Sequence, residues 1–387
     1  MNPSLSDEQK MLDATIQRLC EDIFSLQALR DVEKSDGGFS QALWEAFGKH
    51  GICGVQVVEA YEGLGLGAVE AAIIYERLGR SLVHTPHFVS CILAARLIAV
   101  GGSAMQKQRW LPRIATGEIH LTVASLEPEG DARASGINLL AVDDGDTLIL
   151  QGCKHFVPFA ETADAMIVLA RRAGLPSGNV IAVIVDSKSS GLRIRRQHNL
   201  ATEPYSSVLF QNVRVPLENI LNSGRDSWNI WREAMFNGII PLAAMATGAA
   251  GAALEMSVKY ANERQAFGRA IGGFQALAHD LADAAVAIQG CRAMVRRAAA
   301  TCDGGRPFRR LAAMAKLQAC STFRSVSALS IQVHGGIGYT LSADPQLYFR
   351  RAKQWQLLNW SDADLENEIY ELTFTEASSE HAMADDV

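Results

Sequence analysis

Residues 238–283 read GIIPLAAMATGAAGAALEMSVKYANERQAFGRAIGGFQALAHDLAD, and this stretch decides how the second half of the chain folds. Its first part, Gly238–Met256, is apolar for nearly the length of a membrane span. It is nevertheless rich in Ala and Gly, contains Pro241, and continues into the charged residues Lys259 and Glu263. We therefore predict a buried helix whose small residues allow close packing, and no membrane span.

The same alanine-rich pattern extends outward from this stretch. Residues 227–375 have the periodicity of a helical bundle joined by short loops. The predicted helices cover roughly residues 227–265, 274–302, 307–333 and 343–370. The polar segment 376–387 is expected to form a flexible, frayed tail.

The middle of the chain has a different pattern. Residues 121–226 contain short β-rich runs, and Asp143–Asp146 between two of them is a hairpin signal. Short strands joined by turns favour a small antiparallel sheet or barrel. Residues 1–120 show helical periodicity that begins at a capping box formed by Ser6 and Gln9. The sequence thus predicts an α+β protein with an N-terminal helical domain, a middle antiparallel β-barrel and a C-terminal four-helix bundle.

The composition excludes several classes of protein. The 387 residues are 48% hydrophobic and 20% charged, an ordinary globular balance, and the net charge of -6 argues against a nucleic-acid surface. Seven scattered cysteines without a C-x-x-C pair indicate reduced thiols and a cytoplasmic location, and the first ten residues do not resemble a signal peptide. The nine histidines lack metal-ligand spacing, so we expect no metal.

Four blocks carry a resemblance to a known family. They are Gly51–Arg80, the paired segments Ala124–Asp131 and Leu150–Asp164, then Tyr260–Asp283, and finally Ile331–Lys353. The third block, YANERQAFGRAIGGFQALAHDLAD, is the most specific. In order and spacing the blocks resemble the acyl-CoA dehydrogenase family over nearly the whole chain. The resemblance implies FAD bound between the subunits of a tetramer, and removal of an α-proton and a β-hydride from an acyl-CoA.

The resemblance also implies which residues contact the cofactor. They are Arg264, Phe267 and Gln275 in the third block, Gln332, Gly335 and Gly336 in the fourth, and Phe156 over the flavin ring in the second. A guanidinium suits a diphosphate through bidentate, charge-assisted bonds, and paired glycines permit close backbone approach. On residue type alone, Arg264 could instead be a solvated helix charge, and the glycine pair a helix C-cap and turn.

The chain departs from the family where the flavin ring and the base would lie. The base is a glutamate at one of two family positions, and these fall on Gly238 and Asn359 here. Neither residue can accept a proton as a general base. Leu126 and Pro158 replace two threonines that meet the flavin in the family, and proline offers neither a hydroxyl nor a backbone N–H.

Other residues near these positions have alternative interpretations. Glu233 could be a displaced base, although a solvated carboxylate beside Arg232 is the simpler interpretation. Asp362 and Asp364 are expected at a helix N-cap or in a loop. Glu127 matches a structural glutamate of the family. Tyr339 is expected either to line the acyl pocket or to lie in the core.

An intact diphosphate side with an altered ring side resembles one branch of the family. In that branch, heterotetramers of two dissimilar subunits degrade steroids and other bulky acids, and one subunit supplies the glutamate. The resemblance therefore implies a homologous dehydrogenase subunit as partner and an electron-transferring flavoprotein as acceptor. A catalytically silent scaffold subunit, and a homotetramer that uses an unaligned carboxylate, remain alternatives. The sequence does not identify the acyl chain.

Overall fold

The computed structural model describes residues 5–130, 132–174, 180–221 and 226–384, and within it the chain forms two compact units. The helical unit comprises Met1–Leu26, Gly67–Val83 and Ile239–Val387. The sheet unit comprises Gln27–Leu66 and His84–Gly238. The predicted order of helical, β and again helical segments along the chain is confirmed.

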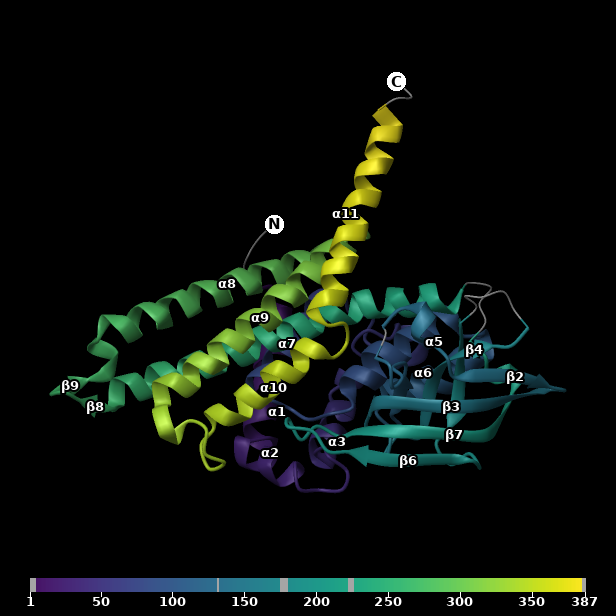
Figure 1. Cartoon of the computed structure of the whole chain (residues 1–387), viewed down its shortest axis with the longest axis horizontal. Coiled ribbons are helices and arrows are strands. Elements are labelled where there is room, and N and C mark those ends of the chain that lie inside the picture. The colour runs from purple at the N-terminus through teal and green to yellow at the C-terminus, as the bar shows by residue number, and fades with distance from the viewer. Residues whose placement is uncertain (1–4, 131, 175–179, 222–225, 385–387) are drawn as a thin grey trace. The chain divides into compact units, whose positions relative to one another are not determined.

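The helical unit is built from long helices, of which α11 extends away from the others at a steep angle (Figure 1). They are α1 (Asp7–Ile23), α4 (Ala68–Arg80), α7 (Ser227–Glu263, whose first residues belong to the sheet unit), α8 (Gln275–Asp303), α9 (Arg309–His334), α10 (Pro345–Leu357) and α11 (Asp362–Ala384). Helix α9 packs against α8, α10 and α11, and α4 packs against α1 and α8.

Small residues bring α4 and α7 close together, as predicted for the alanine- and glycine-rich stretch. A Cβ atom at Gly79 would lie 1.9 Å from the carbonyl oxygen of Met245, and one at Gly248 would lie 1.9 Å from that of Glu76. Because real Cβ atoms do not approach backbone oxygens so closely, only glycine fits at these two positions.

Helix α7 is long and apolar enough to cross a membrane by length and composition, the one such helix among the residues that the structure describes. Its most apolar window is, however, 72% buried inside the protein. A buried core helix passes the same test of length and hydropathy, and this burial supports the predicted packing role.

The fourth predicted bundle helix, 343–370, is divided in two. Helix α10 ends at Leu357 and α11 begins at Asp362, and both Asn359 and Trp360 between them have positive φ angles of 52° and 70°. The buried Lys316 amine donates hydrogen bonds to the carbonyl oxygens of Leu358 (3.3 Å) and Trp360 (2.7 Å). These bonds compensate the carbonyl groups that the broken helix leaves unpaired. Beyond this break α11 continues to Ala384, through most of the segment predicted as a frayed tail, and Asp385–Val387 lie outside the described residues.

The sheet unit combines short helices with one sheet. The helices are α2 (Leu26–Val32), α3 (Gln41–Lys49), α5 (Ala95–Gly101) and α6 (Ala104–Ala115), and a π-helical segment, η3 (Phe88–Ala94), leads into α5. The strands are β1 (Leu121–Ala124), β2 (Leu140–Asp144), β3 (Thr147–Pro158), β4 (Ala165–Arg172), β5 (Val180–Asp186), β6 (Leu192–Gln197) and β7 (Tyr205–Pro216).

The seven-stranded sheet follows the order β1-β4-β2-β3-β7-β6, and β5 also pairs with β4. Strands β2 and β3 form the predicted hairpin. Most pairs are antiparallel as expected, but β4 runs parallel to both β1 and β2. The middle domain is therefore a mixed sheet rather than an all-antiparallel barrel, because β4 enters between β1 and β2 instead of following a meander.

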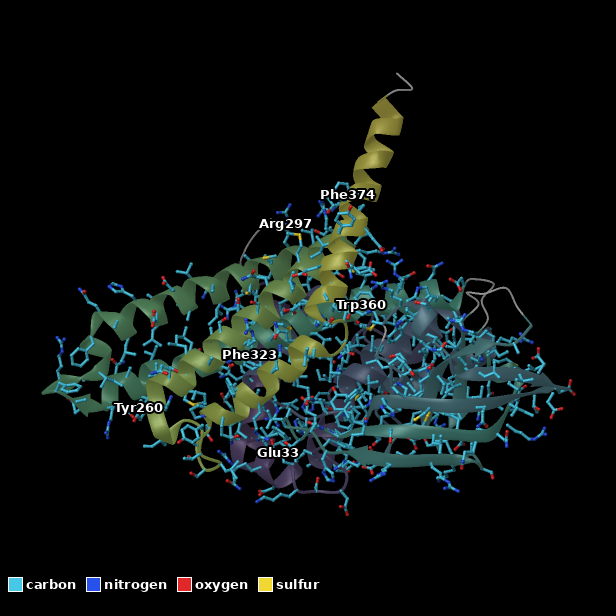
Figure 2. All side chains as sticks on the ribbon, viewed as in Figure 1. Glu33, Tyr260, Arg297, Phe323, Trp360 and Phe374 are labelled. Carbon is cyan, nitrogen blue, oxygen red and sulfur yellow. The ribbon has the colours of Figure 1, made fainter. Side chains whose placement is uncertain are left out.

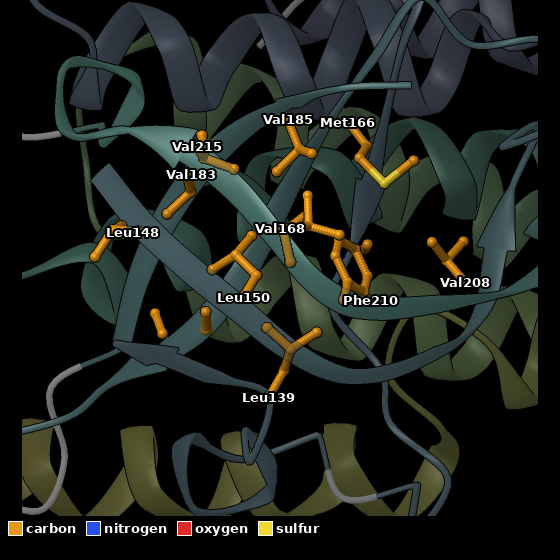
Figure 3. Packing of buried hydrophobic residues seen from close by; sticks show 14 of the residues in the cluster. Leu139, Leu148, Leu150, Met166, Val168, Val183, Val185, Val208, Phe210 and Val215 are labelled. Carbon is orange, nitrogen blue, oxygen red and sulfur yellow. The ribbon is translucent and has the colours of Figure 1, made fainter. Parts of the chain in front are cut away.

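Alternating side chains of this sheet form one hydrophobic core (Figure 3). Leu148, Leu150, Val168 and Phe210 are each fully buried there. Burial of a side chain of this size stabilises a fold by roughly 1.5–3 kcal/mol. This core gives rigid support to the turns and bulges at the ends of the strands.

Candidate cofactor half-site and base positions

The third and fourth sequence blocks meet at one end of the helical unit (Figures 1 and 2). Helix α7 ends at Glu263, a short hairpin of β8 (Gln265–Ala266) and β9 (Arg269–Ala270) follows, and α8 begins at Gln275. A small hydrophobic cluster around Ala261, Leu281 and Val333 joins this corner to the end of α9. The structure thus brings together six of the predicted cofactor residues, Arg264, Phe267, Gln275, Gln332, Gly335 and Gly336, and we call this region the α7–α9 corner.

Arg264 lies at the end of α7 with its side chain exposed. Its backbone N–H donates to the carbonyl oxygen of Tyr260 at 2.8 Å, and its own carbonyl accepts from Ile271 at 2.9 Å. The backbone of Arg264 is therefore fixed on both sides, while the guanidinium extends into solvent. Such an arrangement suits a group that receives an external anion.

The glycine pair ends α9 with an open backbone. Gly335 has φ 62° and ψ -142°, a conformation that L side chains rarely adopt. A Cβ atom at Gly335 or Gly336 would meet no other heavy atom within 4 Å. The conformation explains the glycine at 335, whereas packing among the described residues does not require one at 336. A bare backbone facing open space fits a ligand that approaches it closely, as a diphosphate would.

The tip of the β8–β9 hairpin presents an aromatic ring to solvent. Phe267 is 96% exposed and has a positive φ of 52°. Its ring meets the edge of Phe274 at 6.2 Å, and the Arg269 guanidinium lies 4.1 Å above Phe274. Strained backbone and an exposed apolar ring together are typical of a binding surface.

The predicted flavin-ring residues lie in the sheet unit, on the irregular end of β3. Phe156 has φ 51° and is 44% exposed, and its N–H donates to Gln197 Oε1 at 2.9 Å. Pro158 offers no donor, and its carbonyl accepts from Thr122 Oγ1. The ring of Phe156 is thus available for stacking, but no hydroxyl or N–H replaces the missing threonine at Pro158.

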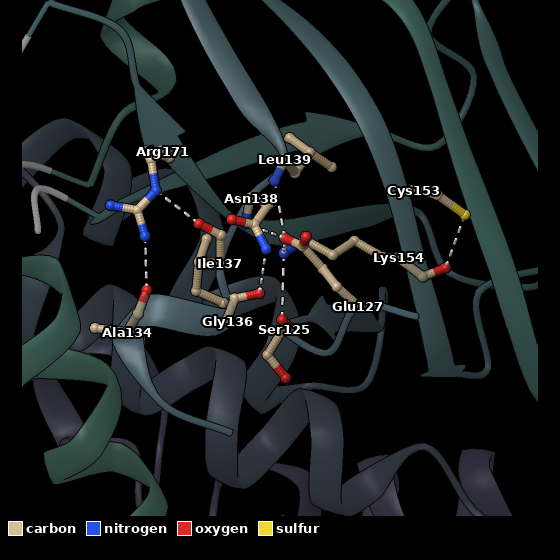
Figure 4. A network of polar contacts seen from close by, with 10 residues as sticks. All are labelled: Ser125, Glu127, Ala134, Gly136, Ile137, Asn138, Leu139, Cys153, Lys154 and Arg171. Atoms are coloured by element: carbon tan, nitrogen blue, oxygen red, sulfur yellow. Dashed lines mark hydrogen bonds and ion pairs between the residues drawn. The ribbon is translucent and has the colours of Figure 1, made fainter. Parts of the chain in front are cut away.

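Glu127 is structural, as the resemblance implied (Figure 4). Its Oε1 accepts from the Lys154 amine at 2.6 Å and from the N–H groups of Asn138 and Leu139 at 2.9 Å. Lys154 is fully buried, and burial lowers its pKa to about 8 against the opposing attraction of Glu127. The pair fastens the segment that carries Leu126 to strand β3.

Gly238 is enclosed by apolar side chains. A Cβ atom there would lie 2.9 Å from Leu93 Cδ2 and 3.4 Å from the ring of Phe88, both in the π-helical segment. The first of the two family positions for the base is therefore filled by neighbouring residues. A glutamate side chain does not fit here without rearrangement.

Asn359, the second family position, lies in the break between α10 and α11. Its positive φ suits asparagine better than most residues. Asp364 accepts from the N–H and hydroxyl of Ser361 at 2.8 and 2.7 Å, so Ser361 caps α11, and Asp362 and Asp364 lie in the first turn of the helix instead of at the expected N-cap or in a loop. Asp362 bonds to Gln356 through Oδ2, while its Oδ1 is buried without a hydrogen-bond partner.

The structure also places Glu233 and Tyr339. The Glu233 carboxylate forms an ion pair with Arg96 at 3.0 Å. Tyr339 is 70% exposed, so the interpretation as a core tyrosine is wrong. No group of three or more His, Cys, Asp or Glu side chains gathers as a metal site within the described part of the chain.

A cavity of about 490 Å³ in the helical unit lies apart from these residues. Its walls carry the ion pairs Arg77–Asp13 and Arg292–Glu76, at 2.6 and 2.7 Å. None of the predicted site residues lines it. The α7–α9 corner is instead an open surface, as expected of half a site.

Some residues at these sites carried no sequence signal. The ring of His334 stacks on that of Tyr260, with centroids 4.3 Å apart and planes inclined by 28°. Stacking between distant residues leaves no mark in a single sequence. The segment around Phe88 and Leu93 is uniformly apolar, so its periodicity could not reveal a π-helix.

Comparison with known proteins agrees with this architecture. Residues 6–118, 122–213 and 227–359 match the N-terminal, middle and C-terminal domains of acyl-CoA dehydrogenase. The chain is 31% identical to the probable acyl-CoA dehydrogenase YngJ of Bacillus subtilis, over 92% of this chain and 95% of that protein. It is 29% identical to CarC, a subunit of the caffeyl-CoA reductase-Etf complex of Acetobacterium woodii, over 86% and 89% of the two chains.

A solved structure extends the likeness to the fold. A variant of the Tcur3481-Tcur3483 steroid ACAD superimposes with a TM-score of 0.86 at 28% identity, over 97% of this chain and all of the other. The chain therefore belongs to the acyl-CoA dehydrogenase family of FAD-binding oxidoreductases that act on acyl-CoA.

Proposed function

We propose that this chain is one of two dissimilar subunits of a heteromeric acyl-CoA dehydrogenase and that a homologous partner supplies the catalytic carboxylate. The observation that carries the proposal is an asymmetry within the chain. The α7–α9 corner retains Arg264 and an open Gly335-Gly336 backbone, whereas Gly238 and Asn359 occupy both base positions.

The bound flavin would supply the redox chemistry by taking a hydride from the acyl β-carbon. The role of this chain is to bind and orient the cofactor. Arg264 neutralises the diphosphate charge, and the glycine pair allows the diphosphate to approach the backbone. In the sheet unit, the exposed ring of Phe156 offers a separate surface on which a flavin ring can stack.

The surface around the α7–α9 corner supports a subunit partner. Four apolar side chains there are highly exposed: Phe267 at 96%, Leu341 at 81%, Tyr339 at 70% and Ile337 at 57%. Soluble monomers rarely leave such residues uncovered in one region. A homologous subunit, together with the cofactor that it shares, would cover them.

The missing base supports a partner that is not an identical copy. An identical copy would bring Gly238 and Asn359 again, and neither can abstract a proton. A general base must lie within hydrogen-bond reach of the proton, but it need not belong to the same chain. A homologue with glutamate at either position would complete the site.

Substrate and electron acceptor follow from the relatives. The likeness to a steroid ACAD favours a bulky acyl-CoA. The likeness to a subunit of a reductase-Etf complex favours an electron-transferring flavoprotein as the acceptor. Both assignments belong to the proposal.

A second candidate rests on Asp362. Its buried Oδ1 lacks a hydrogen-bond partner, and it lies three residues beyond the Asn359 position. A homotetramer could use this carboxylate as a displaced base. Gln356 donates a hydrogen bond to the Asp362 carboxylate, and a structural residue at the start of a helix is held in the same way. The heteromeric assignment therefore has the stronger support.

Purification of the chain alone and with a homologue that carries the glutamate tests the proposal. We expect flavin absorbance and acyl-CoA-dependent dye reduction only from the co-expressed pair. A yellow, active preparation of this chain alone would contradict the heteromeric assignment. A pair that binds flavin but remains inactive after Glu→Gln substitution in the homologue would agree with it.

A further inference from the structure

The stacked rings of Tyr260 and His334 join the two segments that hold the cofactor. Tyr260 lies one helical turn before Arg264 on α7, and His334 directly precedes Gly335 at the end of α9. We infer that this ring pair is a positioning element that fixes the spacing between the Arg264 guanidinium and the Gly335-Gly336 backbone. The inference rests on the proposed cofactor role of these residues.

The path from the rings to the cofactor residues is short and rigid. The carbonyl oxygen of Tyr260 accepts the N–H of Arg264 at 2.8 Å, so a shift of Tyr260 moves Arg264 with it. On the other side, His334 is bonded covalently to Gly335, whose N–H donates back to the carbonyl of Gln332. No side chain intervenes between either ring and the residue that it positions.

The orientation of the His334 ring is itself fixed. Its Nδ1 lies 2.8 Å from the carbonyl oxygen of Ser330, so the Nδ1–H tautomer donates within α9. This bond holds the ring plane against Tyr260 at the observed 28° inclination. Tyr260 needs only its ring face for the contact, whereas His334 uses both a ring face and one nitrogen.

The contact differs from ordinary core packing. Ala261 and Val333 beside the two rings are 1% and 5% exposed and already hold α7 against α9. The rings themselves are only half-buried, at the edge of this cluster that faces the cofactor residues. Removal of the rings should therefore loosen the geometry of the corner more than it destabilises the fold.

The test measures FAD affinity in the flavin-binding assembly, by equilibrium dialysis and by flavin fluorescence. We expect His334→Ala and Tyr260→Ala each to weaken FAD binding about tenfold, the magnitude of an aromatic contact. His334→Phe and Tyr260→Phe keep a ring and should stay within about threefold of the parent. The double Ala variant should be no weaker than either single variant, because both remove the same contact.

Control variants distinguish a positioning role of the two rings from a role in folding and from direct contact with FAD. Arg264→Ala should weaken FAD binding in the presence of the intact stack, while Tyr370→Ala, an exposed ring on α11, should leave it unchanged. Thermal melting should show a small change for the ring variants. Parent-like FAD affinity in both Ala variants would overturn the inference, as would a Phe variant that binds as weakly as the Ala variant. These measurements need only an assembly that binds flavin, so their outcome does not depend on which subunit supplies the catalytic base.

Discussion

Position 238, where the family resemblance places a catalytic carboxylate, holds a glycine with neighbouring side chains packed closely around it. Glycine there has no carboxylate, and Phe88 and Leu93 occupy the space into which a side chain would extend. The π-helical backbone of Phe88–Ala94 carries both residues. A carboxylate at position 238 would therefore require the packing of the sheet unit to change at more than one position.

We predict that Gly238→Glu destabilises the protein and restores no activity. The new side chain collides with Leu93 and buries a carboxylate among apolar groups, which should cost about 2 kcal/mol or more in the free energy of unfolding. Urea denaturation measures this cost. Gly290→Glu is the matched control, because a Cβ at Gly290 on α8 meets nothing within 4 Å. That variant should be neutral or slightly stabilised, and equal behaviour of the two would refute the packing argument.

Positive φ angles mark several of the predicted site residues. Phe156, Phe267 and Asn359 all adopt this conformation, which is uncommon for residues with side chains. Each lies where the chain leaves a regular element, at a bulge, a hairpin tip and a helix break respectively. Such strain persists only where surrounding structure imposes it, and it concentrates at binding sites.

At the scale of elements, His87 connects the π-helical segment to the short helix η1 (Ile52–Gly54). Its Nε2 donates to the carbonyl oxygen of Ile52 at 2.9 Å, and burial lowers the pKa of His87 to about 4 from the ordinary 6.5. Because the unfolded chain takes up a proton more readily, the contribution of His87 to stability is fully present above pH 6.5 and is lost as the pH drops towards 4.

We therefore predict that acid sensitivity decreases in His87→Gln. Protonation of His87 alone should account for about 3 kcal/mol of the stability lost between pH 6.5 and pH 4, since each pKa unit corresponds to ~1.4 kcal/mol. Urea denaturation at pH 7 and pH 4.5 measures the difference. Burial also lowers the pKa of His120 to about 4, so this histidine should keep part of the pH dependence of stability in the variant. An unchanged pH dependence in the variant would show that His87 is not the responsible group.

Glu127 and Lys154 form a buried ion pair at 2.6 Å that links the segment of Leu126 to the end of β3 that carries Phe156. Glu127→Ala removes the acceptor of two backbone N–H groups and the counter-charge of the buried Lys154 amine, which keeps only its hydrogen bond to the Ser125 carbonyl. We expect a loss of about 3–5 kcal/mol in the free energy of unfolding. The double variant Glu127→Gln, Lys154→Met should lose much less, because the glutamine still accepts from the backbone and no charge is buried. A double variant as unstable as Glu127→Ala would contradict this account.

The sequence predicted regular elements well and irregular ones poorly. The periodicity of α7, α8 and α9 placed those helices to within a few residues, because local repetition determines a long helix. The break at 358–361 escaped prediction because it depends on Lys316, whose amine reaches the loop from a helix far away in sequence. The parallel position of β4 likewise depends on strand pairing across the unit, which hydrophobic alternation does not encode.

The candidate site was predictable to the extent that it consists of short motifs. Arg264, Gly335 and Gly336 each stand in a specific block, and folding brings them to one corner of the helical unit. The stack of Tyr260 on His334 and the filling of the Gly238 position depend on three-dimensional contacts and needed the structure.

For the whole molecule, we propose that this chain binds the cofactor and that another chain abstracts the proton. The helical unit presents an exposed Arg264 and the open Gly335-Gly336 backbone, and the sheet unit presents an exposed Phe156 with no threonine donor beside it. Within the described residues, the carboxylates nearest in sequence to the base positions are engaged elsewhere, Glu233 with Arg96 and Asp362 with Gln356. These contacts within each unit support the proposed division of roles between two subunits.

The most direct test follows exchange of the substrate α-proton in deuterated water, catalysed by the assembled complex. We predict that exchange survives Glu233→Gln and Asp362→Asn in this chain and disappears when the glutamate of the partner is changed to glutamine. Loss of exchange in Asp362→Asn or Glu233→Gln, with flavin still bound and the partner's glutamate intact, would contradict the account and place the base in this chain.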